Sequence, residues 1–108
     1  MSTISTHVLD TSLGTPAAGI RITLERADDA QRVGSDKTDA DGRLRDVAAG
    51  PIPAGTYRLR FDTAEYFGRT GRAVFYPEVV VTFVVSDDRQ YHVPLLISPY
   101  GYSTYRGS

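Results

Sequence analysis

The sequence predicts a mainly β protein, a β-sandwich with one short helix, and three observations lead to this prediction. Several short segments alternate apolar and polar residues with a period of two, as half-buried strands do. Turn-forming residues separate these segments, and only one segment has helix signals. About seven or eight short strands in a chain of 108 residues are typical of a sandwich with immunoglobulin-like proportions.

Two segments show the alternation most clearly. In residues 20–24 the two isoleucines and the leucine face one side, while Arg21 and Thr23 face the other. Residues 57–61 alternate tyrosine, leucine and phenylalanine with two arginines in the same way. Both segments are therefore predicted to be half-buried strands of an antiparallel sheet. A first short strand is expected near residues 5–10.

Two further strands are predicted in the second half of the chain. Val79–Val85 is apolar on both faces, so we expect it to be covered on both sides, either by the core and a helix or by a partner subunit. Residues 91–97 form the other strand. Because Pro94 in this strand has no N–H to donate, we expect it near a bulge or a locally unpaired edge.

Turn signals lie between the predicted strands. Residues 14–16 follow the first strand, and residues 39–42 form a tight turn in which Gly42 supplies the positive φ. Residues 49–55, rich in glycine and proline, are expected to form a loop. Residues 86–88 are a further turn, which we expect to close a hairpin.

The single helix is predicted over Thr63–Arg69. Thr63 can cap its first turn, which also contains the acidic residue Glu65. Gly68 or Gly71 can end it, because a glycine tolerates the backbone conformation that terminates a helix.

The composition fits one domain over residues 1–108 and excludes several classes of protein. The 12 lysines and arginines balance 13 acidic residues, for a net charge of −1, so a dedicated nucleic-acid binder is not expected. The absence of cysteine excludes a disulfide scaffold, a thiolate zinc site and a cysteine nucleophile. The longest apolar run, Val79–Val85, is far short of the ~20 residues of a membrane span. No secretory signal is visible, so we expect the protein in the cytoplasm.

Two histidines, His7 and His92, are the first candidates for proton transfer. An unperturbed imidazole titrates at about pH 6.5, near neutrality. Both histidines lie on predicted strands rather than in loops, so their positions alone favour structural roles.

The spacing of ligand-type residues gives little support for a metal site. Zinc needs three or four protein ligands, and the chain offers two isolated histidines with no His-x-His pair. Residues 39–42 superficially resemble a calcium loop. Aligned on Gly42, however, the first ligand position is Lys37 and the closing glutamate position is Ala48, so the match fails. We expect no metal and no other cofactor.

Arginine supplies almost all of the positive charge, since Lys37 is the only lysine. Arg43 and Arg45 directly follow the tight turn and share one face of a short strand. Such an arginine can present its planar fork to a flat, carbonyl-rich ligand. A solvated surface role is nevertheless the more common explanation for each of them.

The last ten residues include three tyrosines, Tyr100, Tyr102 and Tyr105. Chain ends are usually frayed and polar. Aromatic residues this close to the end suggest that it is held at an interface or in a pocket. The alternative is an edge strand whose tyrosines pack on the sheet.

Four blocks of sequence, taken together and in this order, form a recognisable pattern. The blocks are His7-Val8-Leu9-Asp10 with Gly14-Thr15-Pro16-Ala17, Thr38-Asp39-Ala40-Asp41-Gly42-Arg43, Tyr91-His92-Val93-Pro94-Leu95-Leu96, and Tyr105-Arg106-Gly107-Ser108. With them the chain resembles the transthyretin-like family, and within it the branch of 5-hydroxyisourate hydrolases, over essentially its whole length. Residues 96–100 are also similar to transthyretin proper, a hormone carrier, whereas His7, Arg43, His92 and the final tetrapeptide are typical of the hydrolase branch only.

The resemblance implies two four-stranded sheets, one short helix and a homotetramer whose central channel contains the active sites. It implies hydrolysis of 5-hydroxyisourate to 2-oxo-4-hydroxy-4-carboxy-5-ureidoimidazoline, a step of urate degradation, without a cofactor or metal. A small-ligand carrier that uses the same channel is the alternative, and a β-sandwich interaction module is a third possibility. A carrier needs an apolar channel, whereas the histidines and Arg43 would make it polar.

The family's site residues match His7, Arg43, His92 and the segment Tyr105–Ser108 here. His7 and His92 are expected to act as a pair on the attacking water, with His92 the better candidate for orienting or deprotonating it. Arg43 would hold the substrate oxygens and stabilise the charge that develops on the carbonyl. Tyr105 and Ser108 would contact the planar substrate and close the pocket.

Overall fold

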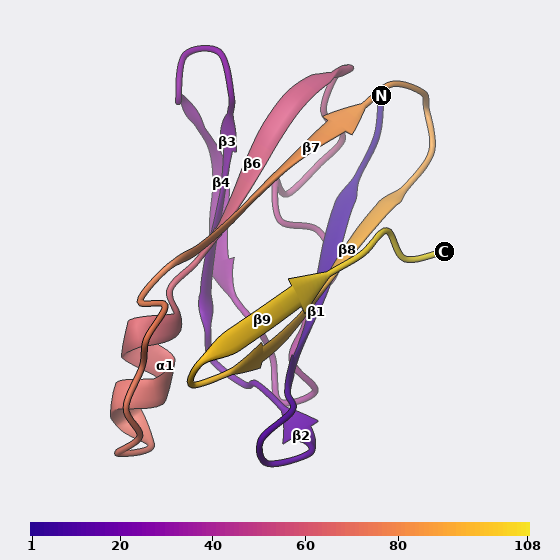
Figure 1. The fold of residues 1–108 in the computed structure, drawn as a ribbon. Helices are drawn as coiled ribbons and strands as arrows, with labels where there is room; N and C mark the ends of the chain where they lie inside the picture. Colours follow the sequence, from indigo (N-terminus) through magenta and orange to yellow (C-terminus); the bar gives the residue numbers. More distant parts are fainter.

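Alternating residues build two β-sheets that pack face to face, as Figure 1 shows for the computed structural model, which describes residues 1–108. The predicted mainly β sandwich with one helix is confirmed. The first sheet has five strands rather than the expected four, because the two-residue strand β5 also pairs with β1. Its strands are β1 (Ile4–Asp10), β2 (Thr15–Pro16), β5 (Arg43–Leu44), β8 (Tyr91–Ser98) and β9 (Gly101–Thr104). The second sheet contains β3 (Arg21–Arg26), β4 (Arg32–Lys37), β6 (Gly55–Phe61) and β7 (Val79–Val85).

The strand order of each sheet determines which residues become neighbours. The first sheet runs β2-β1-β8-β9, and the second runs β4-β3-β6-β7 with every pair antiparallel. In the first sheet β1 and β8 are parallel, and this register sets Ser5 beside His92 and His7 beside Pro94. The parallel pair therefore brings together residues that lie far apart in the sequence.

The expected hairpin at residues 86–88 is wrong. The strands on either side, β7 and β8, belong to different sheets, so this segment crosses from one sheet to the other. The Tyr91 hydroxyl anchors the crossing by accepting hydrogen bonds from the backbone N–H groups of Ser86 and Asp87, at 3.0 and 3.2 Å. Turn residues mark where a strand ends, but they do not determine which sheet the next strand joins.

Successive side chains of a strand point to opposite faces, so one face of β8 packs in the core and the other faces outward. Val93, Leu95 and Ile97 are buried between the sheets. His92 lies on the opposite, outer face of the same strand, because it is out of phase with these three residues. Residues 5 and 7 of β1 lie on this outer face as well, in register with β8.

Pro94 lies where the β8–β9 ladder stops, as expected. The last pair of the ladder is Leu95 with Thr104, and the next bridge joins His92 to Gly107. Pro94 falls in the gap between them, where no N–H is needed. Its carbonyl accepts a hydrogen bond from the Thr104 hydroxyl at 2.7 Å.

The edge strands β7 and β9 leave apolar side chains uncovered. Val80 and Val84 on the outer face of β7 are 38% and 62% exposed, so the chain itself covers only one face of this strand. Tyr100, in the turn before β9, and Tyr102, within β9, are also exposed. The expectation that the chain's own core and helix cover both faces of Val79–Val85 is therefore wrong, and cover by a partner subunit stays a prediction.

Helix α1 spans Thr63–Arg69, the predicted range, although its cap differs from the expectation. Asp62 is the N-cap, and its carboxylate accepts from the Glu65 N–H at 3.1 Å. The Thr63 hydroxyl donates instead to the Tyr76 carbonyl. Past the end of the helix, Gly71 adopts a positive φ of 69°. No helix of the structure has the length and hydropathy of a membrane span.

A buried carboxylate joins β1 to the segment that follows the helix. Asp10 is fully buried, and it accepts hydrogen bonds from the Tyr66 hydroxyl at 2.8 Å and the Ser12 hydroxyl at 2.7 Å. Arg72 forms an ion pair with the same carboxylate at 2.5 Å. Burial raises the pKa of Asp10, but the hydrogen bonds from Arg72, Ser12 and Tyr66 outweigh this effect and lower it to about 2.

Replacing Asp10 with asparagine is expected to lower the free energy of unfolding by about 3 kcal/mol, because it leaves the Arg72 guanidinium without its charged partner. Because the pKa of Asp10 is lowered in the folded state, its ionised carboxylate stabilises the fold fully at pH values above the ordinary pKa of 3.8. As the pH falls from 3.8 towards 2, about 2 kcal/mol is lost in the wild type but not in the variant. Urea denaturation between pH 7 and pH 2 measures both effects. Asp28→Asn, at an exposed position, is the control, and equal losses in the two variants would contradict the prediction.

Candidate active site

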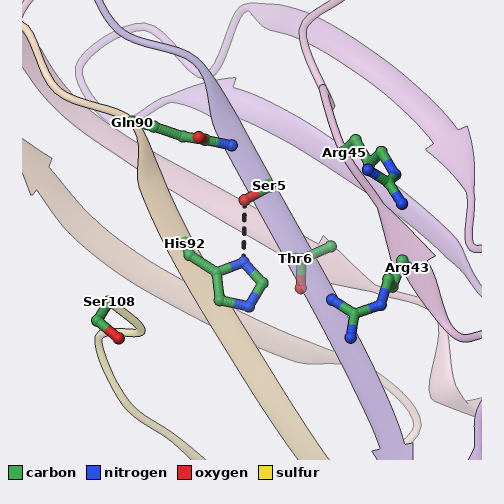
Figure 2. Close-up of a pocket in the computed structure, with 7 residues that line it drawn as sticks. All are labelled: Ser5, Thr6, Arg43, Arg45, Gln90, His92 and Ser108. Atoms are coloured by element: carbon green, nitrogen blue, oxygen red, sulfur yellow. Dashed lines mark hydrogen bonds between the residues drawn. The ribbon is translucent and has the colours of Figure 1, made fainter.

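A polar pocket of about 350 Å³ opens on the outer face of the first sheet, across β8, β1 and β5. None of its lining residues is hydrophobic. Figure 2 shows the two arginines on one side of β1 and His92 on the other, with Ser108 beyond the histidine. The lining residues are Ser5, Thr6, Arg43, Arg45, Gln90, His92 and Ser108.

The imidazole of His92 is half-buried at the centre of this arrangement. Its Nδ1 lies 2.9 Å from the Ser5 hydroxyl, while Nε2 has no hydrogen-bond partner in the protein and points away from Ser5 (Figure 2). Burial lowers the pKa of His92 below its ordinary value of 6.5, and the nearby charges of His7 and Arg43 lower it further. The ring is therefore neutral at pH 7 and can accept a proton.

His7 lies on β1 directly opposite Arg43 of β5. Its Nε2 is 2.9 Å from the Asp41 carbonyl oxygen. A carbonyl can only accept a hydrogen bond, so Nε2 of His7 bears a proton. His7 does not line the pocket, although it lies close enough to His92 to depress the pKa of that residue.

A tight turn positions Arg43. The Asp39 carboxylate accepts hydrogen bonds from the N–H groups of Asp41 and Arg43, at 2.9 and 3.0 Å. Gly42 has a φ of 73°, and a Cβ at this position would lie 2.5 Å from the Val8 carbonyl oxygen, so no other residue fits.

The two pocket arginines have no ion-pair partner. All the ion pairs of the structure are formed by other basic groups, so the guanidinium groups of Arg43 and Arg45 remain free for a ligand. Free guanidinium groups in a polar pocket can bind carbonyl oxygens or an anion.

The last residues of the chain fold back on His92. The Gly107 N–H donates to the His92 carbonyl at 2.9 Å, and a Cβ on Gly107 would lie only 2.4 Å from Cδ2 of the imidazole. The guanidinium of Arg106 lies 4.8 Å from the centre of the Tyr91 ring, which is a cation–π distance. These contacts hold the end of the chain in place and bring Ser108 to the edge of the pocket.

Tyr105 lies elsewhere. It is 59% exposed and lines a neighbouring hollow of about 330 Å³ with apolar side chains that include Val81, Phe83 and Val84. This hollow and the polar pocket share His92. Within one chain, Tyr105 therefore does not reach the side of the pocket where Arg43 lies.

The family comparison agrees with this geometry. Residues 4–107 match the model of the HIUase/Transthyretin family. This chain belongs to that family. A 5-hydroxyisourate hydrolase of Caulobacter vibrioides is 47% identical over 115 residues, which cover 100% of both chains. The 5-hydroxyisourate hydrolase of Mus musculus is 42% identical, with 99% of this chain and 96% of the mouse protein covered. The resemblance predicted from the four sequence blocks is confirmed.

Solved structures of the HIUase/Transthyretin family superpose closely on this chain. The structure of Klebsiella pneumoniae 5-hydroxyisourate hydrolase has a TM-score of 0.92 at 44% identity and covers 100% of both chains. Sea bream transthyretin in complex with thyroxine has a TM-score of 0.88 at 28% identity and covers 97% of this chain and 94% of its own. The fold is therefore shared by the enzyme and carrier branches, and it does not distinguish them.

Sequence reasoning assigned His92, Arg43 and Ser108 to the site of this family member, and they line one pocket. It did not assign Ser5, Thr6 or Gln90. Ser5 and Thr6 lie near His92 because β1 and β8 pair in parallel, whereas Gln90 precedes His92 by two residues in the same segment. No periodicity in the sequence indicates that register. No group of three or more His, Cys, Asp or Glu side chains is arranged to hold a metal ion.

Proposed function

We propose that this chain hydrolyses 5-hydroxyisourate to 2-oxo-4-hydroxy-4-carboxy-5-ureidoimidazoline, the activity for which its relatives are named. The main support is the pocket itself, where a neutral imidazole lies opposite free guanidinium groups with no apolar lining. A volume of about 350 Å³ suits a flat, purine-sized molecule with several carbonyl groups.

The proposed reaction begins with a water molecule held at Nε2 of His92. The imidazole removes a proton as the water oxygen attacks a ring carbonyl, and general-base help of this kind is typically worth ~10²–10⁴-fold in rate. Arg43 stabilises the oxyanion of the tetrahedral intermediate. The ring C–N bond then breaks, and the leaving nitrogen takes the proton back from His92. The new carboxylic acid of the ring-opened product loses the second proton of the water to solvent and becomes a carboxylate.

Three further residues have supporting roles in the proposal. His7 orients Arg43 and the substrate across β1 and β5. Ser108 contacts the substrate at the edge of the pocket. Tyr105 covers the planar substrate only after assembly, since in a single chain it faces the neighbouring hollow.

A carrier without chemistry is the competing function, because the fold is shared with transthyretin. The polar lining of the pocket disfavours it. The carrier function also gives no role to an imidazole held neutral between a serine and two arginines.

An ultraviolet assay tests the proposed function. Freshly generated 5-hydroxyisourate is mixed with the chain in the presence of a strong chelator, and its loss of absorbance is compared with spontaneous decay. We expect catalysed loss, with a ring-opened carboxylate identified by carbon-13 NMR. Decay at the spontaneous rate, with the substrate bound but intact, would favour the carrier function. Activity lost to the chelator and restored by zinc would show that the reaction needs a metal.

The pH dependence of kcat/KM is expected to show an acid limb below pH 6.5. His92 must be neutral to accept the proton, and its pKa is lowered by burial and by the charges of His7 and Arg43. Arg43→Gln removes one of these charges, so its acid limb is expected to move to higher pH. A rate profile over pH 4.5–8.5 measures both, and a wild-type midpoint well above 6.5 would argue against His92 as the base.

We also propose that the chain assembles as a homotetramer in the cytoplasm. The exposed apolar face of β7 and the exposed tyrosines of β9 lie on the two sheet edges, and such edges are usually covered in the working state of a protein. Light scattering at micromolar concentration is expected to return about four times the 11.8 kDa of one chain. Val84→Arg is expected to reduce that mass, whereas Arg58→Gln, on the neighbouring strand, is the control. A stable wild-type monomer would contradict the assembly.

A further inference from the structure

Ser5 is the one side chain that holds the His92 ring by a hydrogen bond. It is only 7% exposed, and its hydroxyl oxygen lies 2.9 Å from Nδ1 of His92 (Figure 2). None of the four sequence blocks includes it, and the proposed reaction gives it no role. Its place opposite His92 results from the parallel register of β1 and β8.

The direction of this hydrogen bond depends on which acceptor receives the hydrogen of the Ser5 hydroxyl. A serine hydroxyl has one hydrogen to donate and two lone pairs that accept. The same oxygen lies 3.5 Å from the backbone carbonyl of Tyr91, which can only accept. With the hydroxyl hydrogen directed at that carbonyl, the oxygen accepts from His92, so Nδ1 bears the proton.

We propose that Ser5 is a positioning residue that fixes His92 in the Nδ1–H tautomer and leaves the Nε2 lone pair free for the attacking water. The choice of tautomer matters because a neutral imidazole has only one nitrogen that can take a proton. In the Nε2–H tautomer the unpartnered nitrogen would be a donor and could not act as a base.

Packing around the ring supports this assignment. Gly107 closes over the Cδ2 edge of His92, so the ring is held between β1 and the end of the chain. His7 shows the opposite arrangement, with its proton on Nε2 facing Asp41. The two histidines of the site are thus held in opposite tautomers.

Nitrogen-15 NMR of the histidine-labelled protein tests the inference without substrate. At pH 8 we expect Nδ1 of His92 to give a protonated, pyrrole-type signal and Nε2 an unprotonated, pyridine-type signal. His7 is expected to give the reverse pattern and is an internal control. A pyridine-type Nδ1 in wild-type His92 would overturn the proposal.

Variants connect the tautomer to activity, and this part rests on the proposed function. Ser5→Ala is expected to abolish the tautomer preference of His92 and to lower kcat about 10-fold with little change in KM, the scale of losing an outer partner of a functional histidine. Ser5→Thr keeps a hydroxyl and is expected to restore both. Ser35→Ala, which removes a strand serine bonded to Thr23 on the opposite sheet, is the control.

The outcomes separate the two proposals. Should the wild type show the expected tautomers but no hydrolysis, the role of Ser5 stands and the proposed function fails. The role of Ser5 would be overturned if the Ser5→Ala protein kept the Nδ1–H form of His92 and full kcat, even if the wild type is an efficient hydrolase. The wild-type spectrum decides the tautomer if Ser5→Ala does not fold.

Discussion

Replacing His92 with asparagine is expected to lower kcat for 5-hydroxyisourate by about two orders of magnitude or more while the fold is kept. Asparagine is close in size and can still reach the Ser5 hydroxyl, but it cannot take a proton from water, and general-base help is worth ~10²–10⁴-fold. Steady-state rates at pH 7.5, together with melting temperature and mass, measure the effect.

His7→Asn is the matched comparison, because it changes the other histidine of the site. His7 does not line the polar pocket, so its loss is expected to reduce activity less than the loss of His92. A His92→Asn protein that retains most of its activity would remove His92 from the mechanism. A larger loss for His7→Asn than for His92→Asn would exchange the roles of the two residues.

Deleting residues 105–108 is expected to abolish hydrolysis and to cost little stability. The segment makes one backbone hydrogen bond, from Gly107 to His92, and one cation–π contact, from Arg106 to Tyr91, which together are worth about 1–2 kcal/mol. It nevertheless covers the His92 ring and supplies Ser108. A displacement of about 1 Å at such a site can cost ~10²-fold in rate.

Two point variants separate the parts of this segment. Gly107→Val puts a side chain where a Cβ would lie 2.4 Å from the imidazole, so we expect it to displace the ring and remove most of the activity. Arg106→Ala removes only the contact with Tyr91 and is expected to be mild. Full activity after the deletion would show that the segment has no catalytic role. Loss of the tetramer along with activity would show that it acts through assembly.

The sequence predicted those parts of the fold in which one face of an element is buried. Residues 57–61 alternate apolar and polar side chains, and they form the last five residues of β6, where every second side chain is buried. Strand β4 was not predicted, because it is a polar edge strand with Gly34 in its middle and buries almost nothing. The hairpin expected at residues 86–88 is wrong because β7 and β8 belong to different sheets, which face the same core from opposite sides. The turn residues between them do not indicate this crossing.

The site was predictable only for residues whose type alone indicates a chemical role. A histidine, or an arginine after a tight turn, stands out in a sequence, so His92 and Arg43 could be proposed. Ser5 is an ordinary strand residue, and only the parallel register places it at the pocket. Gln90 is an ordinary loop residue two positions before His92, and nothing in its type indicates a functional role. The position of Tyr105 in the neighbouring hollow likewise depends on how the end of the chain passes Pro94.

The central claim is that the polar pocket across β8, β1 and β5 is where the substrate is hydrolysed. A crystal structure of the assembled protein with an inert, planar purine dione such as xanthine tests it most directly. We predict the ligand against Arg43, with one carbonyl carbon facing Nε2 of His92 and Ser108 at its edge. A ligand found instead in the apolar hollow beside Val81 and Phe83, with the polar pocket empty, would contradict the account.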